Sequence, residues 1–313
     1  MSDRGVRPDL SIVLVNWNAF DLTTAALTSI EDRTEGIEYE GFVVDNGSRG
    51  DGAETLGQRF RWVTVIRNQE NLGFSRANNQ AFARARGRYL LALNSDTVQT
   101  GNALGDAVRY LDEHPEVGAL GIRHLNGDDA RSTQLSAFGF PRPGRDLAAL
   151  LGLATPSDLT VWPDEAGADR DVDWVCGSFL MVRREVLEAV GGFDERFFVY
   201  EEDIDWCRRA RQAGWVVRYR PALEMIHLRH ASAPQIRDKT FMHFRSRLAY
   251  VRKHHGLVLA TAHYLAMVLR LKLAAAWSGV RWLAGRETGA TFFPRCRRLV
   301  EFLLFRSGRR GVS

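Results

Sequence analysis

The chain has 313 residues, 45% of them hydrophobic and 26% charged, which excludes a disordered protein and allows one large domain with a sizeable core. Its three widely spaced cysteines form neither a zinc-binding pattern nor a disulfide framework, and the first ten residues lack a secretory signal, so a reducing cytosol is the expected compartment. The net charge of +4 is uneven, because residues 241–313 hold fourteen Lys and Arg against two acids.

Predicted strands and helices alternate over the first 120 residues or so. The pattern predicts strands at 10–16, 41–46, 62–66, 88–94 and 117–122, and helices at 21–32, 52–60, 74–86 and 102–113. Apolar strands separated by amphipathic helices predict an α/β fold with a parallel sheet covered on both faces. Ligands of such sheets bind outside the carboxyl ends of the strands. Asn16, Asp45, Asn94 and Asp96 all fall at those ends.

The middle of the chain changes character. Residues 126–171 are rich in Gly, Pro and Asp with weak periodicity, which predicts a loop region or an insertion. Regular structure is expected to resume with a strand at 173–184, followed by a helix at 185–190, a second helix from 201 or 202 to about 213, and a strand at 215–221.

The basic C-terminal part has a long helical pattern at 255–283. Its apolar run LVLATAHYLAMVL has thirteen residues before Arg270 and Lys272 interrupt it, which is short of the roughly 20 that a membrane span needs. His263, Arg270 and Arg281 fall near one meridian of the helix, whereas Lys272 lies opposite. The functional interpretation is an interfacial anchor on anionic lipid. The alternative is an ordinary helical subdomain that packs on the catalytic domain and keeps its Arg side chains in water.

Two strand ends carry acids that could bind a nucleotide. Asp45 could accept a hydrogen bond from a base or a ribose, or it could cap the turn formed by the following Asn46, Gly47 and Ser48. The turn Asn94-Ser95-Asp96 could place a carboxylate on Mg²⁺ or Mn²⁺, which prefer oxygen ligands. Asp96 could also be only a capping residue.

A burst of four acids follows at Glu201, Glu202, Asp203 and Asp205. Acids stabilise the start of a helix, but four of them within a few residues repel one another. A carboxylate whose pKa is raised by such neighbours could act as a general base. His227 could complete a metal site with Asp96, although a lone histidine is often structural and His230 is a second candidate.

The order of these motifs resembles that of the family 2 glycosyltransferases with the GT-A fold, and most of all the bacterial rhamnosyltransferase branch. The segments that carry the resemblance are NWNAFDLTTAALTSI, VVDNGS, NLGFSRANNQAFARARGRYLLALNSDT and CGSFLMVRREVLEAVGGFDERFFVYEEDIDWCRRARQAGW, with His227 after them. The resemblance covers about residues 10 to 230 and does not extend through 245–313. It implies a GT-A catalytic domain over 1–240, with a nucleotide-binding sheet flanked by helices, and a basic amphipathic helical extension over 241–313.

The resemblance also implies roles for single residues. The donor nucleotide would contact a set of strand-end and loop residues, namely Asn16, Asp45, Asn71, Gly73, Phe74, Asn78 and Asn94. Asp96 and His227 would hold the divalent metal, Mg²⁺ or Mn²⁺, on the donor diphosphate. Asp203 would be the catalytic base, and Glu202 and Asp205 would orient it or receive the acceptor. The acceptor side would be formed by Trp174, Cys176, Gly177 and Ser178.

Asn94 departs from the family pattern, in which many relatives carry Asp at this position. The amide still offers a carbonyl oxygen, but one negative charge is lost, so metal affinity is expected to be lower. The implied reaction is an inverting sugar transfer from a TDP-, UDP- or GDP-sugar, with rhamnose as the first guess. It needs no covalent intermediate and therefore no nucleophilic Ser or Cys.

Three other functions compete with this prediction. A sugar nucleotidyltransferase or a dinucleotide-dependent dehydrogenase would carry a Gly-rich loop after the first strand, where this chain has Asn16-Trp17-Asn18-Ala19. A non-catalytic scaffold docked at a membrane would explain the basic tail but not Asp96, Asp203 and His227 together. The expected partners are a nucleotide sugar, a glycan or polyprenyl-linked acceptor, and the anionic inner face of the cell membrane, with no nucleic acid.

Overall fold

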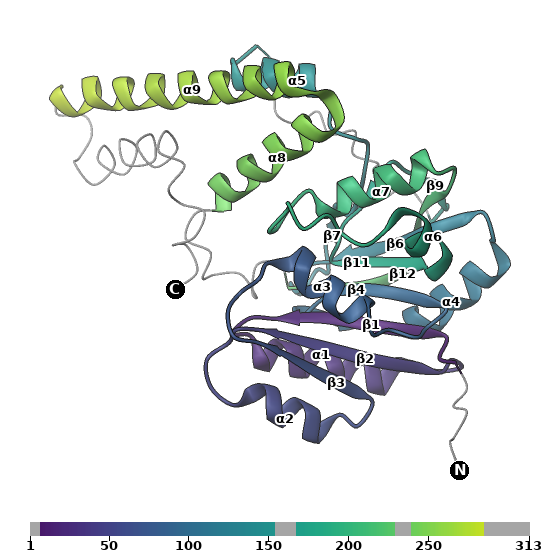
Figure 1. Ribbon diagram of the computed structural model, residues 1–313. Coiled ribbons are helices and arrows are strands. Elements are labelled where there is room, and N and C mark those ends of the chain that lie inside the picture. Colours follow the sequence, from purple (N-terminus) through teal and green to yellow (C-terminus); the bar gives the residue numbers. More distant parts are fainter. Residues whose placement is uncertain (1–6, 154–166, 229–238, 285–313) are drawn as a thin grey trace. The chain divides into compact units, whose positions relative to one another are not determined.

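The computed structural model describes residues 7–153, 167–228 and 239–284, which fall into two compact units (Figure 1). The first unit contains every described strand together with α1 to α4, α6 (Arg184–Val190) and α7 (Glu202–Gln212). The second contains α5 (Pro143–Leu150), α8 (Lys239–His255) and α9 (Leu257–Leu283). The chain therefore leaves the first unit after Phe140 to form α5 and then returns to it.

The first unit is built on a ten-stranded mixed sheet in the described part of the chain. Its main path runs β3-β2-β1-β4-β11-β6-β12-β5, and β7 and β9 pair at its margin. The strands of the path are β1 (Leu10–Asn16), β2 (Tyr39–Asn46), β3 (Val63–Asn68), β4 (Tyr89–Asn94), β5 (Thr97–Gln99), β6 (Val117–Leu125), β11 (Phe179–Arg183) and β12 (Val216–His227). β1, β2, β3 and β4 pair in parallel, β11 pairs antiparallel with both β4 and β6, and β6 and β12 are parallel again. This mostly parallel α/β sheet agrees with the predicted fold.

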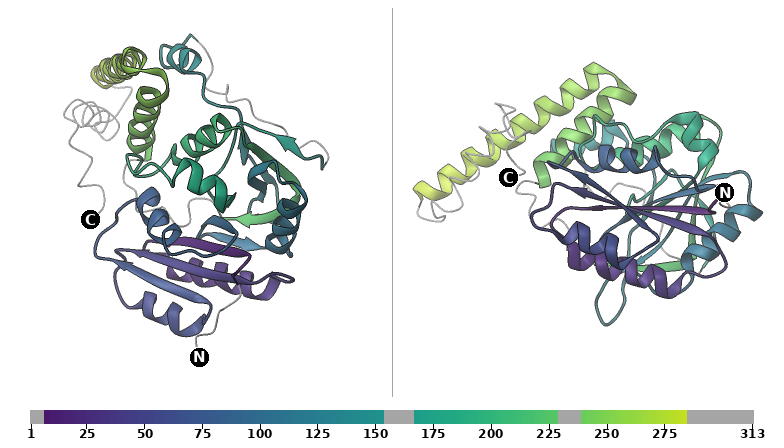
Figure 2. Two further views of the ribbon diagram at one scale, coloured as in Figure 1. Left: turned by 45° about the vertical axis from the view of Figure 1, so that its right-hand side comes forward. Right: turned by 60° about the horizontal axis from the view of Figure 1, so that its bottom comes forward.

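Helices cover both faces of the sheet, as its apolar strands require. They are α1 (Phe20–Arg33), α2 (Gly52–Arg59), α3 (Phe74–Phe82) and α4 (Ala103–Glu113). The core on one face joins Leu27 of α1, Leu56 of α2 and Leu111 of α4 to Ile12 and Leu91 of the sheet, all of them buried. The helix α3 lies on the opposite face (Figure 2). The separation of α1 and α2 from α3 follows from the strand order, because right-handed crossovers that move outward from β1 to β3 and one that returns to β4 place their helices on opposite faces.

Predicted and observed elements agree closely over the first 125 residues, except that β5 was not predicted and α3 ends at Phe82 rather than at 86. The larger differences lie further on. The strand predicted at 173–184 is wrong as a single element, because it is divided into β10 (Trp174–Val175) and β11 by a turn at 176–178. The predicted loop region 126–171 contains β7 (Thr133–Gln134), β8 (Ala137–Phe138), α5 and β9 (Arg170–Asp171) in its described part. A two-residue strand has no measurable period, so these pairings left no pattern in the sequence.

The second unit is helical. Phe244 of α8 and Val268 of α9 are the buried residues of a hydrophobic cluster between these two helices. Arg247 of α8 forms an ion pair with α5, its Nη1 lying 3.2 Å from Asp146 Oδ2. The helical pattern predicted at 255–283 is confirmed by α9, which continues through Arg270 and Lys272 for 27 residues and is therefore not limited to the thirteen residues of the apolar run. Among the described residues it is the one helix long and apolar enough to cross a membrane.

Candidate active site

The carboxyl edge of the sheet brings together the strand-end residues that the sequence predicted for the nucleotide. In the parallel register Asn16 pairs with Asp45, and Asp45 pairs with Arg67. The buried Asn16 amide donates to Asp45 Oδ1 at 3.4 Å and to Ser48 Oγ at 3.1 Å. The half-exposed Arg67 holds its Nε 3.7 Å from Asp45 Oδ2. Asp45 therefore offers a carboxylate that is fixed on both sides.

The predicted donor loop is held by Asn46, the last residue of β2. Its amide nitrogen donates to Asn71 Oδ1 at 2.9 Å, and its amide oxygen accepts from Leu72 N at 3.0 Å. Gly73 has a φ of +88°, and a Cβ there would lie 2.5 Å from the Phe198 carbonyl oxygen. Only glycine tolerates both conditions, so the position of Gly73 depends on its lacking a side chain.

The loop continues into α3, whose two adjacent asparagines differ in their contacts. Asn78 is buried and donates to Phe74 O inside the helix at 2.9 Å. Asn79 instead reaches the segment 191–200: its amide nitrogen donates to Phe193 O at 2.8 Å and its amide oxygen accepts from Phe193 N at 2.9 Å. The backbone N–H of Phe74 also donates to Phe198 O at 2.6 Å. The donor loop is thus attached to the segment that leads into the acidic burst.

The residues predicted for the metal lie on neighbouring strands. His227, at the end of β12, pairs with Thr97 of β5, one residue after Asp96. Its Nε2 lies 3.4 Å from Asp96 Oδ1 and 3.4 Å from the Asn94 amide nitrogen. The other predicted candidate, His230, lies outside the described residues.

The donor set fits a divalent cation that is shared with a substrate. In the described part of the chain no group of three or more His, Cys, Asp or Glu could hold a metal on its own. Mg²⁺ typically uses one or two carboxylates of the protein and completes its shell with water and substrate phosphates. Asp96 and His227 provide one carboxylate and one imidazole, which matches a site that depends on a bound diphosphate.

The turn at 176–178 connects this pair to the acidic burst. Asn94 N donates to Ser178 O at 3.1 Å, and Gly177 N donates to Asp203 Oδ2 at 2.9 Å. A run of hydrogen bonds therefore leads from Asn94 beside His227 to Asp203. Burial raises the pKa of the Cys176 thiol to about 11, so it stays protonated at neutral pH. Trp174, predicted for the acceptor side, is mostly buried, donates from Nε1 to Gly139 O at 2.9 Å and stacks on Phe138.

The acidic burst opens α7 (Glu202–Gln212) after a turn with unusual backbone geometry. Tyr200 and Glu201 have φ values of 67° and 71°, in the left-handed region that side chains other than glycine seldom occupy. Such residues concentrate at functional sites. Glu201, Glu202 and Asp205 are buried, whereas Asp203 is partly exposed. Asp203 is therefore the one acid of the burst that solvent, and hence a substrate, can reach.

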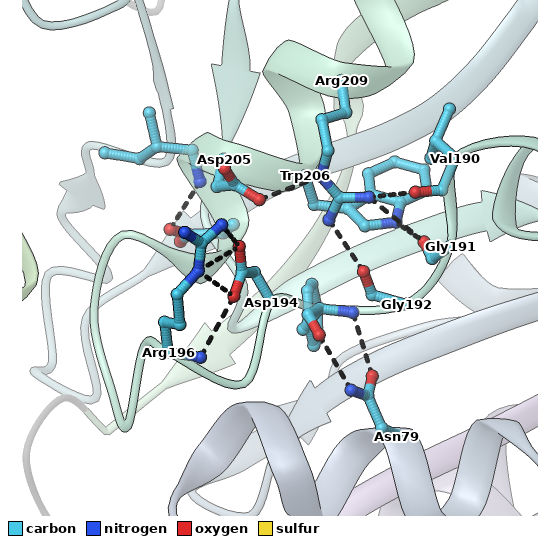
Figure 3. Close-up of polar contacts among 12 residues, drawn as sticks. Asn79, Val190, Gly191, Gly192, Asp194, Arg196, Asp205, Trp206 and Arg209 are labelled. Carbon is cyan, nitrogen blue, oxygen red and sulfur yellow. Dashed lines mark hydrogen bonds and ion pairs between the residues drawn. The ribbon is translucent and has the colours of Figure 1, made fainter. Parts of the chain in front are cut away.

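The buried acids have different surroundings. Asp205 Oδ2 lies 2.9 Å from Arg209 Nε, and Arg209 also donates to the carbonyl oxygens of Val190 and Gly192 (Figure 3). This ion pair therefore fastens α7 to the segment before the burst. Burial, with the charges of Asp203 and Glu201, raises the pKa of Glu202 well above its usual range. A carboxyl that retains its proton is better suited to donate a hydrogen bond than to act as a base.

Comparison with known proteins decides the family. The model of glycosyl transferase family 2 matches residues 11–191, which is more than half of the chain and includes both strand-end clusters. The chain belongs to glycosyl transferase family 2. It is therefore a glycosyltransferase with a nucleotide-sugar donor, as the motif order predicted.

Relatives of this family 2 enzyme include two bacterial rhamnosyltransferases. The N-acetylglucosaminyl-diphospho-decaprenol L-rhamnosyltransferase of Mycobacterium tuberculosis is 31% identical over 234 residues, which cover 68% of this chain and 75% of the relative. The rhamnosyltransferase WbbL of Escherichia coli is 31% identical over 192 residues, which cover 58% of this chain and 70% of the relative.

Solved structures confirm the GT-A fold of the family 2 domain. The mannosyltransferase PcManGT from Pyrobaculum calidifontis, in complex with GDP-Man and Mn²⁺, superimposes with a TM-score of 0.53 at 18% identity, covering 96% of this chain and 89% of that chain. GalNAc-T7, solved with UDP, GalNAc and Mn²⁺, superimposes with a TM-score of 0.55 at 15% identity, covering 72% of this chain and 44% of that chain.

Several residues that build this family 2 site were not among those predicted. Asn79 joins α3 to the segment before the burst, Arg67 pairs with Asp45, and Gln134 contacts His227. Arg67 could have been found, because it lies next to the carboxyl end of β3, in register with Asp45. Asn79 and Gln134 act on partners 114 and 93 residues away along the chain, and no local pattern marks them.

Proposed function

We propose that this enzyme transfers a sugar, with rhamnose as the first candidate, from a nucleoside diphosphate to a hydroxyl of a polyprenyl-linked saccharide, with inversion at the anomeric carbon. The observation that carries the proposal is that Asp203 is accessible within an otherwise buried cluster of acids. Hydrogen bonds through the turn at 176–178 connect Asp203 to Asn94, beside Asp96 and His227. The rhamnosyltransferase relatives support the choice of sugar, and the M. tuberculosis relative supports a polyprenyl diphosphate acceptor.

The proposed reaction uses Asp203 as general base. Its Oδ2 accepts from Gly177 N at 2.9 Å and its Oδ1 accepts from Ile204 N at 2.8 Å, so two backbone N–H groups orient the carboxylate. It takes the proton of the acceptor hydroxyl while that oxygen attacks the anomeric carbon. The bond from this carbon to the diphosphate oxygen breaks, and the diphosphate leaves with the electron pair on the opposite face of the sugar.

The donor side is assigned to the strand-end residues. Asp45 and Asn16 hold the nucleoside, and the loop at Asn71 and Gly73 shapes its pocket. Asp96 and His227 hold a divalent cation, which when bound neutralises the charge of the leaving diphosphate. The Mn²⁺ in the structures of GalNAc-T7 and PcManGT supports a cation in this role.

A panel of nucleotide sugars tests the donor assignment. TDP-rhamnose with Mn²⁺ is expected to raise the midpoint temperature of unfolding more than UDP- or GDP-sugars do, because only a ligand that binds the native state stabilises it. The shift is expected to shrink when EDTA replaces the metal. A larger shift with a UDP- or GDP-sugar would reject rhamnose as the donor. No shift with any nucleotide sugar would reject the assignment of the donor site.

The helix α9 is proposed to bind the chain to the cytoplasmic face of the membrane. Its exposed face carries an apolar stripe at a spacing of one helical turn, formed by Val258, Leu265, Leu269, Leu273 and Val280. On a helical wheel Lys272 flanks this stripe on one side and Arg270 on the other. An apolar face with cations on both sides favours a helix that lies in the plane of an anionic interface.

Binding to liposomes tests this surface. Replacing Leu265, Leu269 and Leu273 together by Ser is expected to weaken binding of the full chain to phosphatidylglycerol-containing liposomes by at least about tenfold, because each lost leucine forfeits more than 1 kcal/mol of apolar burial. Co-sedimentation measures the effect, and Leu135→Ser, which changes an exposed leucine of the first unit, is the matched control. Unchanged binding of the triple variant, or equal binding to neutral phosphatidylcholine, would reject the anchor.

A further inference from the structure

Gln134, a buried residue of β7, contacts His227 through both the backbone and the imidazole ring. Its amide nitrogen donates to the His227 carbonyl oxygen and, at 3.2 Å, to the carbonyl oxygen of Leu125. Its amide oxygen lies 3.1 Å from Nδ1 of the His227 ring. Both polar groups of this side chain therefore contact His227, and the amide nitrogen also joins it to the end of β6.

These contacts fix which way the amide faces. A carbonyl oxygen can only accept, so the end of Gln134 that faces two carbonyls must be the NH₂ group. The end that faces His227 Nδ1 is then the amide oxygen, which can only accept. Nδ1 must therefore be the ring nitrogen that carries hydrogen.

The consequence for the ring is that Nε2 keeps its lone pair in the neutral imidazole. This nitrogen faces Asp96 Oδ1 and the Asn94 amide nitrogen, each at 3.4 Å. The Asn94 amide donates to such a nitrogen, so its placement agrees with this tautomer. A lone pair aimed beside the Asp96 carboxylate is the arrangement that a cation requires of a histidine ligand.

The hairpin between β6 and β7 keeps Gln134 in place. Gln134 pairs with His124 across the two strands, and Asp128 accepts from the N–H and the hydroxyl of Ser132 in the connecting turn at 3.0 and 2.7 Å. The buried ring of His124 packs edge-on against the His227 ring, with the ring centroids 5.6 Å apart.

We infer that Gln134 is a positioning residue for the cation site: it holds His227 in the Nδ1–H tautomer and thereby directs Nε2 toward the metal that Asp96 shares. This inference rests on the proposed function for the identity of the ligand but not for the tautomer. It also gives a role to a segment whose sequence predicts only a loop.

The tautomer can be read directly in the metal-free protein. With ¹⁵N-labelled histidine, a long-range ¹H–¹⁵N spectrum separates the protonated from the unprotonated ring nitrogen, and comparison with His227→Gln assigns the signal. Wild-type His227 is expected as Nδ1–H. Gln134→Met, which keeps the volume and removes both polar groups, is expected to give a mixture of tautomers, whereas Gln134→Glu keeps the acceptor and is expected to restore Nδ1–H.

Metal binding gives the second readout. Loss of the free Mn²⁺ signal in electron paramagnetic resonance, with TDP present, is expected to show affinity about 10- to 100-fold lower in Gln134→Met. Gln134→Glu is expected to remain within a few-fold of wild type. Gln99→Met makes the same change at a buried glutamine of β5, which pairs with Met225 rather than His227, and is expected to bind Mn²⁺ as the wild type does.

An Nε2–H tautomer in the wild type, or unchanged tautomer and Mn²⁺ affinity in Gln134→Met, would overturn the inference. Failure of the proposed function gives a different result. In that case wild type with TDP would not bind Mn²⁺, while the tautomer would still respond to Gln134, because that measurement needs neither nucleotide nor metal.

Discussion

Asp203→Asn is expected to lower kcat for sugar transfer by about 10²- to 10⁴-fold, the range that a general base contributes. The amide cannot take a proton from the acceptor hydroxyl, and the chain offers no exposed substitute within the burst, where Glu201, Glu202 and Asp205 are buried. Binding of the donor is expected to persist, because Asp203 accepts hydrogen bonds from Gly177 N and Ile204 N and is not one of the strand-end residues assigned to the donor. Initial rates with TDP-rhamnose and a short polyprenyl-diphosphate N-acetylglucosamine measure the loss, and the thermal shift by TDP measures donor binding.

Asp205→Asn is the matched control for this prediction. It makes the same chemical change two residues along α7, at a fully buried carboxylate that pairs with Arg209. Loss of one partner of a buried ion pair costs about 3 kcal/mol, so the main effect is expected in the free energy of unfolding, measured with urea. If Asp203→Asn kept near-normal turnover, or if folded Asp205→Asn lost more turnover than Asp203→Asn, the assignment of Asp203 as base would be wrong.

The close agreement at the strand ends has a physical cause. An apolar run that stops at an acid shows both the strand and its carboxyl end, and parallel strands bring those ends to one edge. Asn16, Asp45 and Asn94 could therefore be placed together from local pattern, and their register in the sheet follows. The same reasoning cannot say whether an acid is reachable, because accessibility depends on packing that the sequence does not display. Only the structure separates Asp203 from its buried neighbours.

The residues that escaped prediction share another property. Asn79 and Gln134 act through hydrogen bonds between a side chain and a distant backbone. Each lies in a segment whose local pattern was already assigned to something else, a donor loop and helix for Asn79 and a loop region for Gln134. Asn79 is one residue past the asparagine that the family resemblance assigned to the donor pocket, and Asn78 bonds only within α3 among its described contacts. Gln134 belongs to a two-residue strand inside a Gly- and Pro-rich segment. Periodicity reports which face of an element is buried, and it carries no information about such partners.

Asp96→Asn is expected to reduce kcat/KM by about 10³-fold, equivalent to about 4 kcal/mol of stabilisation of the leaving diphosphate. In this chain the preceding position of the motif is already the amide Asn94, so Asp96 is the one carboxylate that the site offers beside His227. Replacing it removes a negative charge of the protein that attracts the cation and leaves that task to the diphosphate, so affinity for Mn²⁺ in the presence of TDP is expected to fall with the rate. Excess Mn²⁺ is expected to restore part of the activity, because the amide oxygen is still a weak ligand.

Asp112→Asn provides the comparison, because it makes the same change at the other end of β4. Asp112 accepts from the hydroxyl of Tyr89, the first residue of β4, at 2.8 Å, whereas Asp96 follows the carboxyl end of that strand. The backbone at Asp96 is expected to stay in place in the variant, since its carbonyl oxygen accepts from Leu228 N at 2.9 Å whatever the side chain. A rate that falls in Asp96→Asn without any change in Mn²⁺ affinity would show that this carboxylate serves the reaction without holding a cation. An equal fall in Asp112→Asn would show that the loss reflects stability of the sheet rather than the chemistry at its edge.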